Sequence, residues 1–394
     1  MKKQLNFMPH VYVTKLGLSE KHFFHLPGQQ KIYQSMPGAS IHRILRPLLL
    51  GTFLLGCFVT LFLMYFKPST SWLSGPVASE TSTVRLKNLL TNRSEQNQTF
   101  VLVWLWPFGQ TYDLNVCSSL FNIEGCYVTA DRNLYNKSDA VIIHHRDICS
   151  DLSNLPPAYR PAFQKWVWMN LESPSHSSQL PGIENLFNLT LNYRQDADIE
   201  VPYGSIVANQ GDKDFAPPGK SKLVCWIVSN WNPEHVRVKY YNELYKHVEV
   251  HAFGQAFGEY LSDQDYFPTI GSCKFYLAFE NSIHKDYITE KFYNPLFAGT
   301  VPVVLGPPRG NYQNFIQGDA FIHVDDFPSP KELAEFLLLL DKDQEKYLRY
   351  FDWRRHFKVK KAYFWAEHTC LACDHIRRHN EYKTFSNLDK WYWG

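Results

Sequence analysis

The stretch LVCWIVSNWNPEHVRVKYYNELYKHVEVHAF, residues 223–253, holds the clearest alternation of predicted strands and helix in this sequence. It opens on six apolar residues, 223–228, a run whose length and β-branched content are typical of a buried strand. A polar turn around Pro233 follows, and residues 236–247 then predict a helix. A second apolar run, 248–253, predicts another strand. A strand, a helix and a strand in this order are typical of a parallel βαβ unit.

The same alternation continues on both sides of this unit. Near-continuous apolar strands predict parallel sheets that helices cover on both faces. The polar, Pro/Gly-rich segment 205–221 predicts a linker between two Rossmann-like α/β domains, whose ligands bind in a cleft at the carboxyl ends of the strands. The other predicted strands are 100–106, 140–144, 166–171, 274–279, 301–305 and 321–324, and the other predicted helices are 290–298 and 331–341.

The composition excludes several classes of protein. The 394 residues carry 40 Lys+Arg and 38 Asp+Glu, a net charge of +2. This balance argues against a nucleic-acid partner, because nucleic-acid-binding proteins carry a basic surplus. Hydrophobic residues make up 45% and aromatic residues 16%, so the chain is too apolar to be disordered.

Residues 47–66 predict one transmembrane helix. These 20 residues hold no charge and would span about 30 Å at about 1.5 Å per residue, the thickness of a bilayer core. Seven Lys or Arg and one acid precede them, so the positive-inside rule places 1–46 in the cytoplasm and the rest across the membrane. A cleaved signal peptide and a buried core helix are the alternatives, although the run is long and lies far from the N-terminus for a signal peptide.

The residues beyond this helix carry features of a secretory lumen. Seven of the eight cysteines lie there, and an odd number leaves at least one free thiol or an intermolecular bridge. Cys370 and Cys373, flanked by His368 and His375, could bind zinc, form a redox pair or belong to two structural disulfides, which an oxidising lumen favours. All four N-x-S/T sequons also follow the helix, at Asn92, Asn97, Asn136 and Asn188.

The first candidate site lies where strand 223–228 leads into helix 236–247. The free N–H groups and the dipole of a helix N-terminus favour an anion there. Arg237 stands in the first turn, where the dipole disfavours a cation unless an anion binds beside it. A surface arginine without a ligand is the alternative. The sequence has no P-loop and no G-x-G-x-x-G, so it lacks the fingerprints of ATP and NAD binding.

A second turn of this kind joins strand 274–279 to helix 290–298. Thr289 is placed to cap the helix, and Glu290 and Lys291 begin it. Lys291 could bind a phosphate oxygen, and Glu290 could accept hydrogen bonds from sugar hydroxyls. An ordinary capped amphipathic helix is the alternative. Together Arg237 and Lys291 could neutralise a diphosphate without a metal ion.

Glu172 is the candidate general base, because a carboxylate at the end of strand 166–171 is well placed to take a proton. A merely solvated carboxylate is the alternative. His144 and His145 also follow a strand, but neighbours on an extended chain point to opposite faces and chelate one ion poorly. The D-x-D triplets lie in polar stretches rather than at strand ends. We therefore predict no metal site.

Several segments of this sequence resemble the α-1,3-fucosyltransferases, glycosyltransferase family 10. The resemblance covers 43–394, and its most specific segment is FENSIHKDYITEK at 279–291. Residues 1–35 look like an extension that the usual family form lacks. The other segments are WPFGQTYDL (106–114), HHRD (144–147), WMNLESPSH (168–176), VSNWNPEHVRVKYYNEL (228–244) and CLACDH (370–375).

The resemblance implies two Rossmann-like domains, the GT-B architecture, behind a transmembrane signal anchor. It implies inverting transfer of L-fucose from GDP-β-L-fucose to O3 of GlcNAc in Galβ1-4GlcNAc, which makes Lewis x, with no cofactor and no metal. The implied partners are GDP-fucose and N-acetyllactosamine glycans on glycoproteins and glycolipids, and a homodimer is left open. The implied location is the Golgi membrane, as a single-pass type II protein with a lumenal catalytic part. A catalytically silent membrane-anchored lectin and a glycosidase, which would need two carboxylates, are the alternatives.

The resemblance also implies roles for single residues. Glu172 is then the general base, Arg237 and Lys291 hold the diphosphate, and Gln110 contacts the acceptor. The other donor-binding positions are Ser229, Asn230, Tyr241, Asn281, Tyr287 and Glu290. The implied disulfides are Cys117–Cys370, Cys126–Cys373 and Cys225–Cys273, and Cys149, where we expect Ser, is then the unpaired thiol.

Six regions are expected along the chain. A cytoplasmic tail (1–46) and the anchor (47–66) precede a lumenal stem (67–98). The acceptor-side domain (99–210) and the GDP-fucose-binding domain (211–364) follow. A C-terminal tail (365–394) is expected to be tied to the first domain by disulfides.

Overall fold

The computed structural model describes residues 98–394, apart from 157–158, 210–214 and 317–318. The predicted cytoplasmic tail, the predicted transmembrane helix and nearly all of the predicted stem lie outside this range, as do Asn92 and Asn97. Among the residues that are described, no helix is both long enough and apolar enough to cross a membrane.

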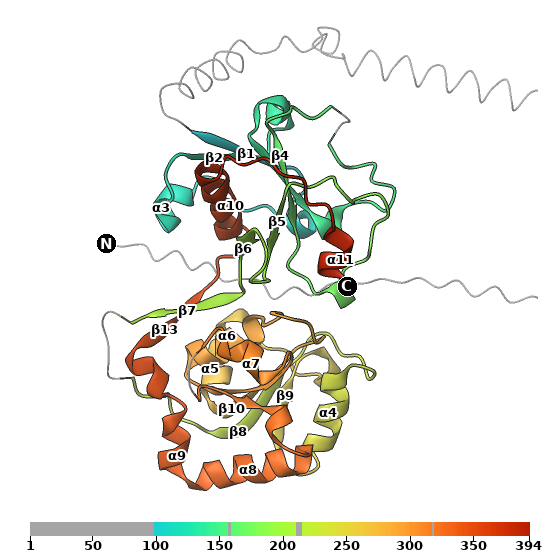
Figure 1. The fold of residues 1–394 in the computed structure, drawn as a ribbon. Helices are drawn as coiled ribbons and strands as arrows, with labels where there is room; N and C mark the ends of the chain where they lie inside the picture. Colours follow the sequence, from blue (N-terminus) through green and yellow to red (C-terminus); the bar gives the residue numbers. More distant parts are fainter. Residues whose placement is uncertain (1–97, 157–158, 210–214, 317–318) are drawn as a thin grey trace, which may run out of the picture. The chain divides into compact units, whose positions relative to one another are not determined.

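The first half of the described chain forms a six-stranded sheet in which all neighbouring strands run parallel (Figure 1). The strand order is β2-β1-β3-β4-β5-β6. The central strands β1, β3 and β4 are buried along their whole length, as expected for a sheet covered on both faces. The strands are β1 (Thr99–Val103), β2 (Cys126–Thr129), β3 (Ala140–His144), β4 (Lys165–Met169), β5 (Leu189–Asn192) and β6 (Ile199–Glu200).

The second half forms a five-stranded parallel sheet in the order β12-β11-β10-β8-β9. Its core contains Trp226 and Phe279 from the strands, with Val238 and Leu337 from helices. The predicted α/β class with parallel sheets is thereby confirmed. The strands are β8 (Lys222–Ile227), β9 (Val250–Phe253), β10 (Cys273–Phe279), β11 (Val301–Leu305) and β12 (Ile322–His323).

Helices and short 3₁₀ turns connect these strands. The predicted helix 290–298 coincides with α6, because Thr289 caps its start and Gly299 ends it in the left-handed conformation. The α-helices are α3 (Cys117–Phe121), α4 (Val236–Leu244), α5 (Asp263–Gly271), α6 (Glu290–Ala298), α7 (Arg309–Gln313), α8 (Pro330–Lys342), α9 (Gln344–Arg349), α10 (Ala366–Arg378) and α11 (Leu388–Tyr392). The 3₁₀ turns are η2 (Pro107–Gly109), η3 (Arg132–Lys137), η4 (His145–Asp147), η5 (Pro174–His176), η6 (Gln255–Phe257), η7 (Val324–Asp326) and η8 (Asp352–Arg355).

Each sheet has one point where the strand order reverses. In the first sheet β1 lies between β2 and β3, and in the second sheet β8 lies between β9 and β10. At such a point two adjacent strands send their following loops in opposite directions along the sheet. The loops therefore leave a crevice between them at the carboxyl edge of the sheet. The topology therefore points to the loops after β1 and β3 in one half, and after β8 and β10 in the other.

The chain passes between the halves twice. β7 (Gly204–Ala208) precedes the second half and β13 (Phe357–Lys361) follows it, and the two strands pair antiparallel. The predicted linker 205–221 is therefore wrong for residues 205–208, which form a strand. Their partner lies far along the chain, so no local pattern could show that their backbone groups are paired.

The C-terminal part of the chain returns to the first half. α10 packs on β1 and β2, and two disulfides, Cys117–Cys370 and Cys126–Cys373, fasten it there. A third disulfide, Cys225–Cys273, joins β8 to β10. The structure thus forms the three implied pairs, and Cys370 and Cys373 belong to structural disulfides. Cys149 is a free, exposed thiol.

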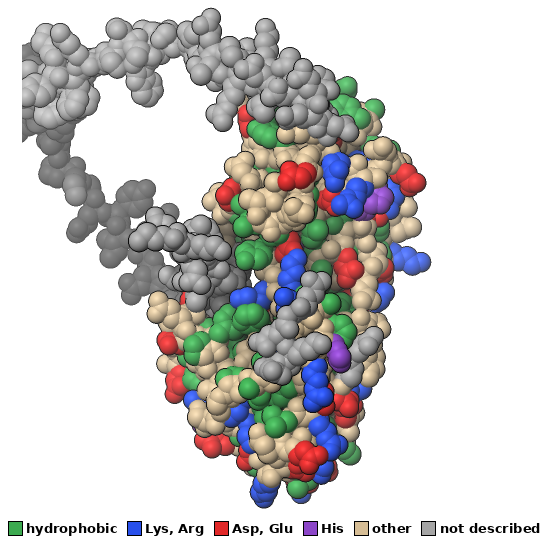
Figure 2. Space-filling model, turned by 90° about the vertical axis from the view of Figure 1, so that its left-hand side faces the viewer, with side chains coloured by type: hydrophobic (Ala, Val, Ile, Leu, Met, Phe, Trp, Pro, Cys, Tyr) green, Lys and Arg blue, Asp and Glu red, His purple; other side chains and the backbone are tan. Residues whose placement is uncertain are grey.

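Acidic and basic side chains are interspersed over the face of the described part that Figure 2 shows. That face presents no continuous basic surface of the kind that binds nucleic acid. The arrangement agrees with the near-zero net charge of the whole chain.

Candidate active site

Arg237 is a buried cation between the two loops of the second half. It lies in the first turn of α4 and is 3% exposed. Nη1 donates to the carbonyl of Phe279 at 3.3 Å and Nη2 donates to the carbonyl of Asn230. Nε is buried and has no hydrogen-bond partner within the described residues. Burial lowers the pKa of Arg237 and the Glu280 carboxylate opposes this effect, so the guanidinium stays a fixed positive charge.

Lys291 is a second cation, held at the start of α6 by two carboxylates. Its Nζ lies 2.9 Å from Oε1 of Glu290 and 3.5 Å from Oε2 of Glu280. Burial lowers the pKa of Lys291, but these carboxylates outweigh burial and leave the pKa above its ordinary value. For Glu290 the signs are reversed. Burial raises the pKa of Glu290, but the charge of Lys291 outweighs burial and leaves this pKa below its ordinary value. Both groups are therefore charged at neutral pH.

Glu280 organises this turn from inside. It is 1% exposed and accepts the backbone N–H of Thr289 at 2.8 Å, and the Thr289 hydroxyl lies 2.9 and 3.0 Å from its two oxygens. Gly306 makes room for it, because a Cβ there would collide with the hydroxyl of Tyr312 and lie 3.3 Å from Cγ of Glu280. Burial raises the pKa of Glu280. The buried carboxylate thus fixes both the helix cap and the lysine.

Asp286 fixes the loop between β10 and α6. Its φ of 61° is in the left-handed region, which Asp tolerates better than most residues. The Asn311 side chain accepts the N–H of Asp286 at 2.7 Å and donates to its carboxylate at 2.6 Å. The same carboxylate accepts the N–H of Gln195, from the first half, at 3.1 Å. This loop is therefore held by both halves of the molecule.

Glu172 follows β4, on a loop whose backbone is tightly held. Its N–H donates to Oδ1 of Asn170 at 3.2 Å, its carbonyl accepts the hydroxyl of Tyr392, and the carbonyl of Leu171 accepts the hydroxyl of Tyr203. The Glu172 carboxylate has no hydrogen bond or ion pair to any described residue. Burial raises its pKa; the most influential opposing charges are those of Arg146 and Lys291.

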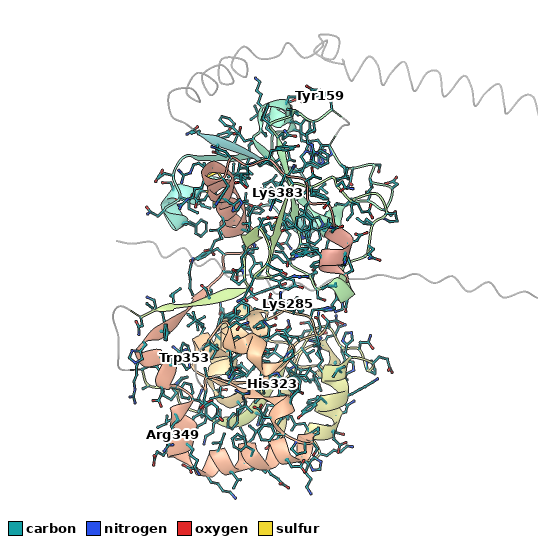
Figure 3. All side chains as sticks on the ribbon, in the orientation of Figure 1. Tyr159, Lys285, His323, Arg349, Trp353 and Lys383 are labelled. Atoms are coloured by element: carbon teal, nitrogen blue, oxygen red, sulfur yellow. A yellow bond between two sulfur atoms is a disulfide. The ribbon has the colours of Figure 1, made fainter. Side chains whose placement is uncertain are left out.

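The loops after β4 and β10 meet across the two halves. The hydroxyls of Ser173 and Ser282 lie 2.7 Å apart, and the Ser175 hydroxyl lies 2.7 Å from Nε2 of His284. Lys285, which Figure 3 labels at this junction, lies 3.3 Å from Asp196 of the first half. The contacts bring the loop that carries Glu172 to the turn that carries Lys291.

This arrangement can support displacement at a carbon that bears a phosphate leaving group. A partly buried carboxylate with a raised pKa and no bound partner is suited to accept a proton. Fixed cations nearby stabilise negative charge as it develops on the departing group. The proton acceptor and the cations come from opposite halves of the molecule. The reacting atoms would therefore lie between the halves.

Comparison with known families agrees with this geometry. The family model "Fucosyltransferase, N-terminal" matches residues 96–204, and "Glycosyltransferase family 10 (fucosyltransferase) C-term" matches residues 217–391. The chain belongs to glycosyltransferase family 10.

Relatives within family 10 extend over most of the chain. A 4-galactosyl-N-acetylglucosaminide 3-alpha-L-fucosyltransferase 9 from Homo sapiens is 59% identical over 351 residues, 89% of this chain and 98% of the relative. The human 4-galactosyl-N-acetylglucosaminide 3-alpha-L-fucosyltransferase FUT5 is 44% identical over 298 residues, which are 74% of this chain and 79% of the relative. A crystal structure of an α1,3-fucosyltransferase with GDP-fucose covers 72% of this chain and 91% of its own, at 18% identity and a TM-score of 0.47.

The structure gathers most of the residues for which the family resemblance implies a role. Arg237, Glu290 and Lys291 surround the turns after β8 and β10, with Ser229, Asn230 and Asn281 on those turns. Tyr287 is 2% exposed and packs edge-on against Tyr193 and Tyr203 of the first half. Its pKa is raised chiefly by burial and further by the carboxylates of Glu172, Glu280 and Glu290.

Two of these residues lie apart from the cluster. Tyr241 is 8% exposed and packs on Trp226 at 4.7 Å between ring centroids, within the core of the second half, and its role in donor binding stays a prediction. Gln110 is exposed and follows η2, in the loop after β1. It lies at the carboxyl edge of the first sheet, but it contacts none of the charged residues above.

Sequence reasoning assigned no role to Glu280, Asp286 or Arg146, although each stands in a quoted motif. Glu280 follows a predicted buried strand directly, which was the available signal for a buried carboxylate. Arg146 is exposed, but its charge reaches Glu172. The position of Asp286 depends on Asn311 and Gln195, and no local pattern indicates those contacts.

The two described sequons differ in exposure. Asn136 is exposed on η3. Asn188 is 1% exposed, its Nδ2 donates to the carbonyl of Lys383, and its Oδ1 accepts the N–H of Trp166 at 2.7 Å. The folded domain leaves no room for a glycan at Asn188, so the predicted glycosylation does not fit the structure at this position.

We expect glycopeptide mapping of the secreted or membrane-extracted protein to find a glycan at Asn136 and none at Asn188. Asn188→Gln should lower the melting temperature, because it breaks buried hydrogen bonds worth about 1 kcal/mol each. Asn136→Gln is the matched control and should shift the protein on a gel without lowering stability. A fully occupied Asn188 in folded, active protein would contradict the expectation.

Proposed function

We propose that this chain is an inverting glycosyltransferase that moves L-fucose from GDP-β-L-fucose to O3 of GlcNAc in Galβ1-4GlcNAc. One observation carries the proposal: the unpaired carboxylate of Glu172 comes from the opposite half of the molecule to lie within electrostatic reach of Lys291, which itself lies within reach of the buried Arg237. The relatives at 59% and 44% identity, named for this reaction, support the choice of sugar and acceptor.

In the proposed reaction Glu172 takes the proton from the acceptor hydroxyl as its oxygen attacks the anomeric carbon of fucose. The hydroxyl is a weak nucleophile, so removal of its proton in the transition state lowers the barrier. Attack comes from the face opposite GDP, so a single displacement converts a β-linked donor into an α-linked product. The raised pKa of Glu172 makes it a stronger base than an exposed glutamate.

Negative charge grows on the diphosphate as the bond to fucose breaks. Arg237 and Lys291 are already fixed by Phe279, Asn230 and the acidic residues of the α6 turn, so they stabilise this charge without reorganising. We propose that these two cations make a divalent metal unnecessary. Glu290, ionised and half-exposed, is placed to accept hydrogen bonds from donor hydroxyls.

We also propose the cellular setting expected from the sequence. Residues 47–66 anchor a type II protein in the Golgi membrane, and residues 67–394 lie in the lumen. The three disulfides support an oxidising compartment, since such bonds rarely persist in the cytosol.

The test is an assay of the full chain, purified in detergent, with GDP-fucose and a Galβ1-4GlcNAc acceptor, with and without EDTA. We expect acceptor-dependent GDP release, an α-1,3-fucoside by product analysis, and the same rate with the chelator. A Galβ1-3GlcNAc acceptor, whose O3 is blocked, is the matched control. Binding of glycan without turnover would favour the lectin, and a rate abolished by EDTA and restored by Mn²⁺ would contradict metal independence.

A further inference from the structure

Two histidines from opposite halves meet beside the cations. His176 ends η5 of the first half, and His235 immediately precedes α4 of the second half. Their ring centroids lie 6.1 Å apart, with the rings nearly perpendicular. His235 occupies the N-cap position, yet its side chain makes no capping hydrogen bond. The His235 ring therefore does not cap its own helix.

Three nitrogen atoms at this place are buried without a partner among the described residues: Nε2 of His176, Nδ1 of His235 and Nε of Arg237. Buried nitrogen donors nearly always have a hydrogen-bond partner, and several orphaned ones together call for an explanation. Arg237 is 3% exposed, so water has little access to its Nε. A ligand with several acceptor oxygens would satisfy all three nitrogens at once.

The charges around the two rings define the chemistry of that ligand. Burial is the main reason that the pKa of each ring is lowered. Arg146, Arg237 and Lys291 lower the pKa of His176 further, and Arg237 and His176 do the same for His235. The leading charges that act on the two rings are all cationic or those of a histidine, and a hydrogen bond to the backbone of Asn281 partly offsets the lowering of the pKa of His176. The surroundings are thus cationic, and they favour an anion.

We propose that His176 and His235 clamp the diphosphate of the donor from the two halves, and that they take up a proton when the nucleotide binds. The inference rests on the proposed function and adds two residues to it. Each imidazole donates a hydrogen bond from its orphaned nitrogen to a phosphate oxygen. Because one ring belongs to each half, the nucleotide then ties the halves together beside Glu172.

The proposed protonation has a definite sign. A bound polyanion favours the charged form of a nearby histidine, so the pKa rises from its depressed value on binding. Affinity for GDP must then increase as the pH falls through the interval between the pKa of the free protein and that of the complex. The interval starts below the ordinary histidine value of about 6.5, since both free pKa values are lowered.

The experiment is calorimetry of GDP binding to the full chain in buffers of different ionisation enthalpy, at pH 6 to 8. We expect the wild-type protein to take up a proton on binding, and we expect His176→Asn and His235→Gln, which each remove the orphaned nitrogen, to reduce this uptake. Each variant should bind GDP about tenfold more weakly, the effect of one lost charge-assisted hydrogen bond. His176→Gln, whose amide nitrogen reaches the place of Nε2, should recover part of the affinity but not the proton uptake.

His251→Asn is the matched control, the same change on β9 of the second half, where the ring lies 3.8 Å from Glu249. It should retain the wild-type affinity for GDP and the wild-type proton uptake. Any proton that GDP itself takes up contributes equally to every variant, so it drops out when the His176 and His235 variants are compared with this control. Unchanged uptake and affinity in both His176→Asn and His235→Gln, with unchanged melting temperatures, would overturn the clamp alone. Failure of the wild-type protein to bind GDP at all would overturn the proposed donor together with the clamp.

Discussion

Glu172→Gln should reduce the rate of fucose transfer by about 10²- to 10⁴-fold, the contribution typical of a positioned general base. The substitution keeps the size of the side chain and the backbone contacts with Asn170 and Tyr392. The amide cannot take the proton, so kcat should fall much more than the affinity for either substrate. Transfer rates and GDP binding, measured on the same preparation, separate the two effects.

The melting temperature distinguishes loss of the base from loss of the fold. Glu172 has a raised pKa in the folded chain, so at neutral pH its charge opposes folding and this cost disappears as the pH falls. Glu172→Gln should therefore melt no lower than the wild type at neutral pH. Glu249→Gln, on an exposed side chain, is the control and should keep full activity. A Glu172→Gln enzyme with more than a tenth of the wild-type kcat would disprove the assignment.

The raised pKa of Glu172 also predicts how kcat/KM falls on the acid side of the pH profile. Glu172 must be ionised to accept a proton, so kcat/KM should fall as the pH drops through its raised pKa. The fall should begin at a higher pH than the ordinary glutamate value of about 4.3 would give.

Arg237→Lys should lower kcat by about 10²- to 10³-fold, the usual cost of removing a preorganised group that stabilises developing charge. Lysine keeps the charge but loses the planar fork that binds the carbonyls of Phe279 and Asn230 while presenting Nε. A positive charge without this geometry would therefore not restore the wild-type kcat. GDP affinity should weaken as well, because the diphosphate of the product meets the same guanidinium.

Steady-state kinetics with varied GDP-fucose, together with GDP titrations, check this expectation. Arg349→Lys is the matched control, since Arg349 lies exposed on α9 and pairs with Glu345 at 2.7 Å. It should leave kcat and KM unchanged. An Arg237→Lys enzyme with wild-type kcat would show that the guanidinium geometry does not contribute to stabilising the charge on the diphosphate.

Local patterns were enough to predict much of the second half. The predicted strand 301–305 and helix 290–298 coincide with β11 and α6, because apolar runs and a Thr cap act over a few residues. Arg237 and Lys291 could also be picked out from such patterns, since each begins a helix after a buried strand. Short strands with polar residues, such as β5 (LTLN), escaped notice because they form only beside their neighbours in the sheet.

The α/β class, the helices that carry Arg237 and Lys291 and the carboxylate at the end of β4 could all be predicted from residue patterns, because these features depend on periodicity, capping and strand ends. Which of these groups lie close together became visible only in the folded structure. The pairing of β7 with β13, the contact of Ser173 with Ser282, the burial of Asn188 and the meeting of His176 with His235 each join distant segments. Such contacts form only when segments that are distant in the sequence come together in the folded chain, and no local spacing of residues encodes that.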